Sequence, residues 1–159
     1  MRSPLAACAL AALLAPAALA AQQTADAEVV AVVRAFFDGM RSKDTAALRV
    51  LTHPSARLIG TGPTQEGQLR VDEVPMDRFL QIVAGAPGTL DEKIWDPEVR
   101  VDGDLATVWT QYAFYYDGKF SHCGVDAFQL ARIAEGWKVV QIADTRRTAG
   151  CPTPPADAK

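Results

Sequence analysis

Three side chains that could take part in acid–base or nucleophilic chemistry lie close together in the stretch His122-Cys123-Gly124-Val125-Asp126. His122 could act as a general base, because an imidazole titrates near neutral pH. Asp126 could act as a general acid if a second carboxylate lay beside it, because a like charge raises the pKa of a carboxyl group. His122 and Cys123 are neighbours on a predicted strand and point to opposite faces, which argues against a cysteine–histidine pair. The candidate catalytic residues are therefore His122 and Asp126.

Each candidate also has an ordinary structural interpretation. His122 can be a strand histidine with ordinary hydrogen bonds, and Asp126 can accept a hydrogen bond from the indole of Trp109 or from the backbone. Asp144, the carboxylate that could lie beside Asp126, can instead pair with one of the two arginines that follow it. The residue types alone leave both interpretations open.

Helices are predicted in the first half of the chain. Apolar residues recur at helical spacing over residues 26–44, where Asp26 can cap the helix start. Shorter helices are predicted for 45–51 and around 76–84, with a strand at 56–60 between them.

Four long strands follow. They are joined by turns at Asp102-Gly103, at Asp117-Gly118 and at 134–136, and Asp-Gly between alternating runs is a strong hairpin signal because glycine takes the positive φ of the turn. Helices followed by an antiparallel meander predict an α+β domain with the helices on one face of a curved sheet. The predicted strands are 94–101, 105–116, 119–133 and 137–147.

The turns set the register of these strands. A two-residue turn at Asp117-Gly118 places Asp126 opposite Trp109, and a three-residue turn after Ile133 places Asp126 opposite Asp144. A two-residue turn there would instead place Asp126 opposite Thr145. One face then holds His122, Asp126, Phe128, Leu130, Trp109, Ile142 and Asp144.

The opposite face is more uniformly apolar, so we expect it to lie under the helices. The first face would then be convex and partly apolar, and pairing of two sheets in a homodimer would cover it. A bulge at Gly124 would turn His122 to the concave side and leave Asp126 where it is. The expected concave face holds Trp95, Val99, Val101, Val108, Tyr112, Phe114, Cys123, Val125, Ile133, Trp137 and Val139.

The order of elements, the run VRVDGDLATVW, the Gly-Trp-Lys that opens the last strand and the closing ADTRR resemble the nuclear transport factor 2-like superfamily, which includes SnoaL-like cyclases and ketosteroid isomerases. The stretch from YDGKFSHCGVDAFQL to the final Gly-Cys is similar to exported bacterial members without an established activity. The resemblance covers residues 26–151. It implies a cone in which helices close over a concave sheet and leave a pocket at the open end.

The pocket implied by the resemblance would be apolar and lined with aromatic residues. No aspartate faces it in the predicted register, which does not favour the acid–base chemistry of the catalytic members. Its candidate residues are Phe36, Phe37, Trp95, Tyr112, Phe114 and Trp137, with His53, Gln141 and, if bulged, His122 as polar groups.

The ends of the chain indicate export. Residues 1–20 read as a signal peptide, with Arg2 before an apolar run that ends in Ala18-Leu19-Ala20, whereas a membrane anchor would need a longer unbroken run than one interrupted by Pro16. Residues 21–25 then form a linker, 26–151 the domain and 152–159 a disordered tail. After cleavage Cys123 and Cys151 remain, and in the periplasm or outside the cell they favour a disulfide over two free thiols.

Composition excludes several function classes. The net charge of −3 comes without a basic tract, so neither nucleic acid nor, after signal cleavage, a membrane is an expected partner. No phosphate-binding glycine loop, dinucleotide motif or metal-ligand spacing is present, so neither a cofactor nor a metal is expected. The leading prediction is a domain that binds a small apolar molecule. The alternatives are a cofactor-free isomerase, cyclase or hydratase, and a non-catalytic dimeric interaction module.

Overall fold

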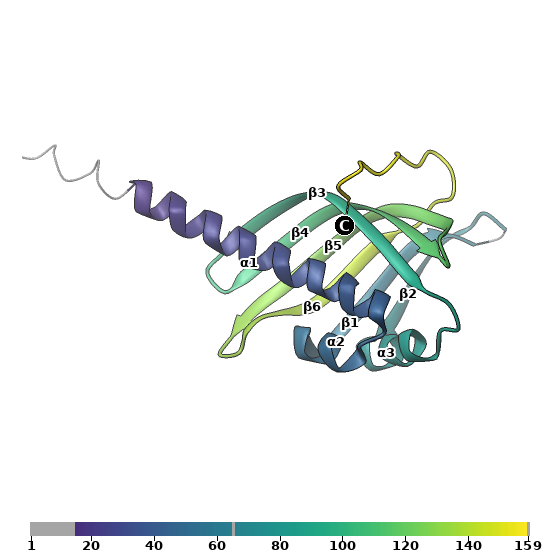
Figure 1. Cartoon of the computed structure of the whole chain (residues 1–159), viewed down its shortest axis with the longest axis horizontal. Coiled ribbons are helices and arrows are strands. Elements are labelled where there is room, and N and C mark those ends of the chain that lie inside the picture. The colour runs from purple at the N-terminus through teal and green to yellow at the C-terminus, as the bar shows by residue number, and fades with distance from the viewer. Residues whose placement is uncertain (1–14, 65, 159) are drawn as a thin grey trace, which may run out of the picture.

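The computed structural model describes residues 15–64 and 66–158 and confirms the α+β class. Three helices pack on one face of a curved sheet (Figure 1). The helices are α1 (Ala15–Ser42), α2 (Thr45–Leu51) and α3 (Met76–Gly85), and the strands are β1 (Thr52–Pro63), β2 (Leu69–Pro75), β3 (Leu90–Asp102), β4 (Leu105–Tyr116), β5 (Lys119–Ile133) and β6 (Gly136–Thr145).

The six strands form one sheet in the order β2-β1-β6-β5-β4-β3. Every neighbouring pair is antiparallel except β1 and β6, which run parallel. Asp117 and Gly118 both have positive φ (50° and 72°), as a two-residue turn between twisted strands requires. The predicted meander from β3 to β6 is therefore present.

Helix α1 buries one stripe of apolar side chains against the sheet. These residues recur three or four positions apart and are at most 4% exposed: Val29, Val33, Phe36, Phe37 and Met40. Asp44 caps α2, accepting a hydrogen bond of 2.9 Å from the backbone N–H of Ala47. Asp26 is not the cap of α1, because the helix begins eleven residues earlier, at Ala15.

Residues 1–14 of the predicted signal peptide lie outside the described residues. Its last six residues, 15–20, are the first residues of α1. None of the helices within 15–64 and 66–158 is long and apolar enough to cross a membrane.

Strand β5 is turned over relative to the prediction. The β4–β5 ladder passes from Tyr115↔Phe120 to Phe114↔His122, which leaves Ser121 as an extra residue on β5. The bulge therefore lies at Ser121 and not at Gly124, and Asp126 pairs with Thr110 rather than Trp109. A shift of one residue moves every following side chain to the other face.

As a result, the predicted convex face is wrong for most of its members. Phe128 and Leu130 are fully buried and Ile142 is 4% exposed, and all three belong to the core under the helices. Trp109 alone among the predicted convex apolar residues is exposed, at 50%. Trp95 is buried but lies outside this core cluster, so its predicted concave position is also wrong.

The β5–β6 register agrees with the prediction at Asp126 and Phe128. Asp126 pairs with Asp144 and Phe128 with Ile142. The turn itself is shorter than predicted, with Ile133 opposite Gly136, and an extra residue at Val140 restores the register.

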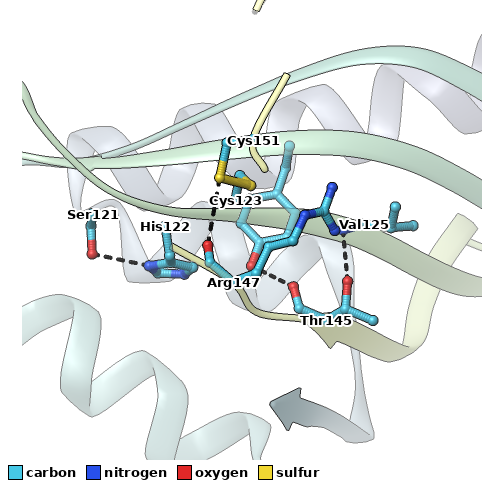
Figure 2. The surroundings of a disulfide bond; sticks show 8 residues. Ser121, His122, Cys123, Val125, Thr145, Arg147 and Cys151 are labelled. Carbon is cyan, nitrogen blue, oxygen red and sulfur yellow. Dashed lines mark hydrogen bonds between the residues drawn. A yellow bond between two sulfur atoms is a disulfide. The ribbon is translucent and has the colours of Figure 1, made fainter. Parts of the chain in front are cut away.

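The predicted disulfide between Cys123 and Cys151 is present, with a Cα–Cα distance of 5.9 Å (Figure 2). Cys123 also exchanges two backbone hydrogen bonds with Arg147, of 2.9 and 3.0 Å. The bond therefore fastens the chain beyond β6 to the start of β5. Cys123 faces away from the helix-covered core, contrary to the predicted concave position.

Candidate functional site

A cleft of about 1040 Å³ opens between α3 and the sheet, at the end where β5 begins and β6 stops. Its walls include apolar side chains from several elements, among them Leu58, Phe79, Val83 and Phe114. This volume suffices for a small organic molecule. The ionisable side chains on the cleft wall are Arg70, Asp72, Glu73, Glu92, His122, Arg146 and Arg147.

Glu92 on the cleft wall and Asp126 behind it form a carboxyl pair. Glu92 projects from β3 and is half-buried, whereas Asp126 on β5 is 3% exposed. The two carboxyl groups are close enough to shift each other's pKa. Oδ2 of Asp126 has no hydrogen-bond partner among the described residues, and two carboxyl groups can bond only through a proton that one of them holds.

The environment favours the protonated form of Asp126. Burial, the charge of Glu92 and the shared hydrogen bond together raise the pKa of Asp126 well above its ordinary value. Burial also raises the pKa of Glu92 to about 7, against the opposing effect of the hydrogen bond from Asp126. The pair thus presents to the cleft a carboxyl group that titrates near neutrality.

Asp144 and Arg146 form an ion pair next to these carboxyl groups. Nε and one terminal nitrogen of Arg146 donate to the two carboxylate oxygens of Asp144 at 2.8 and 3.1 Å. Two parallel hydrogen bonds of this kind make a stronger arginine–carboxylate pair than a single hydrogen bond does. It raises the pKa of Arg146, and the positive charge partly offsets the rise in the pKa values of Glu92 and Asp126.

His122 reaches the cleft as a neutral imidazole. Burial first, and the nearby Arg146 second, lower its pKa below the ordinary value. Its Nδ1 lies 3.0 Å from the hydroxyl of Ser121, and its ring lies 5.0 Å from that of Phe114 (Figure 2 shows the Ser121 contact). The bulge at Ser121, not one at Gly124, turns His122 to this side.

The structure gathers only part of the predicted pocket around the cleft. Phe114 and His122 line it, and Asp126 lies behind Glu92. Phe36, Phe37, Tyr112 and Trp137 are packed in the core instead.

The remaining predicted pocket residues lie elsewhere. His53 contacts the hydroxyl of Ser55 at 2.7 Å, and Gln141 accepts a hydrogen bond of 3.2 Å from Arg57. Neither lines the cleft, and Trp95 lies outside the core.

Glu92 is the candidate site residue that the sequence reasoning missed, whereas the predicted pairing of Asp144 with a following arginine is confirmed at Arg146. The predicted strand 94–101 began at Ile94, yet β3 begins at Leu90, so Glu92 lies two positions before Ile94 and shares its face. The alternation Leu90, Glu92, Ile94 was the signal that could have found it. In the part of the chain that the structure describes, no group of three or more metal-ligating side chains is arranged to hold a metal ion.

Comparison with solved structures shows that the chain has the fold of nuclear transport factor 2-like proteins. It is similar to a putative dehydratase of that family from Streptomyces avermitilis, with a TM-score of 0.63 at 20% identity over 80% of this chain and 99% of that one. A protein with a cystatin-like fold from Novosphingobium aromaticivorans gives 0.62 at 15% identity over 91% and 94%. A Salmonella enterica protein gives 0.63 at 15% identity over 80% and 94%.

Residues 24–143 match the family described as "Putative lumazine-binding", and the chain belongs to that family. No curated protein matches it.

Proposed function

We propose that this protein binds a small, uncharged, mostly apolar molecule in the cleft between α3 and the sheet. The observation that carries the proposal is the combination of an open apolar cleft with a buried carboxyl pair at its wall. Apolar walls supply the contact area, and a few convergent polar groups fix orientation. Glu92 and neutral His122 supply hydrogen-bond donors and acceptors.

The family description favours a planar heterocycle of the lumazine type as the ligand class. Such a molecule carries ring N–H and C=O groups side by side, and a carboxyl group can both donate to and accept from such an edge. Phe114 and Phe79 on the cleft walls offer aromatic contact to a planar ring.

The first test is native mass spectrometry of the protein from its own host, before and after denaturation. A retained small molecule would name the ligand. Lumazine itself would then be titrated by calorimetry against the wild type, Phe114→Ala and, as a control outside the cleft, Gln141→Ala. We expect Phe114→Ala to weaken binding about tenfold through lost ring contact, and Gln141→Ala to leave it unchanged. A ligand that binds the wild type, Phe114→Ala and Glu92→Gln with equal affinity would show that the binding site lies elsewhere.

A second candidate function is acid–base catalysis of an isomerisation, cyclisation or hydration. It is favoured by Glu92, which faces the cleft and has a pKa of about 7, near the optimum for a general acid or base. Asp126 would act through Glu92 by holding the shared proton, and His122 would be a second proton carrier. Turnover that survives in Glu92→Gln would exclude this role for the pair.

We also propose that the protein works after export, in the periplasm or outside the cell. The disulfide supports this location, because such bonds persist in oxidising compartments. Sequencing the N-terminus of the protein from its host should give Ala21 as the first residue. An N-terminus at Met1 would contradict export through a cleaved signal peptide.

A further inference from the structure

The two edges of the sheet are protected to different extents. Edge strand β3 has a bulge between Trp95 and Glu98, a proline at Pro97 and helix α1 packed along it. Each of these features discourages pairing with another strand. Edge strand β2, Leu69–Pro75, has a proline only at its last residue, so β2 is the open edge of the sheet.

The side chains of β2 are unusually exposed for an apolar pair on one face. Leu69 and Val71 are 88% and 71% exposed, and they point to the same side because alternate residues of a strand share a face. Arg70 and Asp72 share the other side, where they form an ion pair of 2.7 Å and line the cleft.

The order of these residues makes β2 complementary to itself. If two copies align antiparallel about Val71, Val71 lies opposite Val71 of the second copy, and Arg70 lies opposite Asp72 of the second copy. Opposite charges in directly facing cross-strand positions stabilise the pair, and like charges destabilise it. Charges on an edge strand usually prevent pairing, but in this alignment the arginine of each copy faces the aspartate of the other.

We propose that two copies of this chain associate edge to edge through β2, antiparallel and centred on Val71. Their sheets become continuous, and Val71 gains Val71 of the second copy as its facing neighbour, while Leu69 lies opposite Glu73 and diagonal to Val71 of the second copy. Because Arg70 and Asp72 line the cleft, the second copy lies along the outer wall of each proposed ligand site, a consequence that rests on the proposed function. A contact of two short strands is small, so we expect a weak, reversible dimer.

Charge exchange at Arg70 and Asp72 tests the alignment. Sedimentation velocity over a concentration series should show a reversible dimer for the wild type. Arg70→Asp or Asp72→Arg alone should weaken association at least about tenfold, because each places two like-charge pairs across the axis. The double variant R70D/D72R should restore it. A monomeric wild type at all concentrations, or a double variant as weak as the single ones, would overturn the proposal.

Cysteine cross-linking locates the axis independently of charge. Val71→Cys should form a covalent dimer under mild oxidation, seen on a non-reducing gel, because the two copies of residue 71 face each other. Glu73→Cys is the matched control, since Glu73 faces Leu69 of the second copy and should not cross-link. Trp109→Lys alters the exposed tryptophan on the sheet face and should leave the dimer intact. Loss of the dimer in Trp109→Lys, or equal cross-linking at 71 and 73, would assign the contact to another surface.

Discussion

Tyr112 lies across Gly124, and its hydroxyl donates a hydrogen bond of 2.9 Å to the backbone carbonyl of Thr145 on the far side of β5. A Cβ atom at Gly124 would lie 2.7 Å from Tyr112 Cε1 and would overlap the Thr145 carbonyl. Thr145 is also tied to β5, because its hydroxyl accepts from the N–H of Val125 at 3.1 Å. This contact fixes the end of β6, and hence Arg146, beside the cleft.

Gly124→Ala should therefore destabilise the protein strongly. The methyl group has a backbone carbonyl and a buried ring in its way, so either β6 or Tyr112 must move, and we expect a loss of more than about 3 kcal/mol in the free energy of unfolding. Chemical denaturation measures it. Gly85→Ala at the end of α3 is the control, because a Cβ added there would meet no atom within 4 Å and its effect should stay within about 1 kcal/mol. Equal stability of the two variants would contradict the role of Gly124.

Glu92 should make stability fall as pH rises towards neutrality. Its pKa is about 7 in the folded protein against 4.5 as the ordinary value, so the folded state binds more protons between these limits. The contribution is fully present below pH 4.5 and is lost as pH rises through 7. It amounts to at most about 3 kcal/mol, and the raised pKa of Asp126 acts in the same direction.

Denaturant unfolding between pH 5 and 8 checks this sign. Glu92→Gln removes the titrating group, so the difference in stability between variant and wild type should shift in favour of the variant as pH rises. A difference that stays constant across this range would show that Glu92 titrates at its ordinary value.

Arg146→Met should destabilise the protein by leaving the carboxylate of Asp144 buried without its partner. Asp144 is 9% exposed but the Arg146 side chain is 56% exposed, so the cost should lie between that of a surface pair and that of a buried pair, at about 1 to 3 kcal/mol. The double variant Asp144→Asn with Arg146→Met should recover most of this loss, since no unpaired charge remains. Thermal unfolding of the four proteins of this cycle gives the coupling between the two residues. Additive losses would mean that the pair contributes nothing beyond its separate members.

Cys151→Ser should lower the free energy of unfolding by about 3 kcal/mol, because the bond closes a loop of 28 residues in the unfolded chain. The wild type under reducing conditions should match the variant. His122 adjoins Cys123, so ligand affinity in Cys151→Ser also reports how far the bond positions the cleft wall. A variant as stable as the oxidised wild type would show that the bond does not constrain the fold.

The class of fold and the hairpin order could be predicted from this sequence, because helical and strand periodicities and the Asp-Gly turns are local signals. The face of β5 could not, because a bulge at Ser121 has no local signature and reverses Asp126, Phe128 and Leu130 together. The opposition of Asp126 and Asp144 was predicted through a longer turn, which the extra residue at Val140 replaces.

The carboxyl pair escaped prediction for a related reason. Glu92 and Asp126 belong to strands separated by β4, so their approach depends on the curvature of the whole sheet. The nearby arginine, Arg146, follows the end of another strand, β6. No spacing within one strand encodes such a meeting.

The parallel pairing of β1 with β6 has a consequence for how the chain folds. Arg57 and its partner Gln141 are 84 residues apart, so β1 cannot find its central neighbour until nearly the whole domain has left the ribosome or the export channel. Contacts this distant in sequence make folding slow relative to helical domains of the same size. The hairpins β3–β4 and β4–β5 can form early, whereas β1 can pair with the rest of the sheet only after β6 has formed. Until then the apolar face of the sheet is incomplete and exposed, which favours binding by a chaperone.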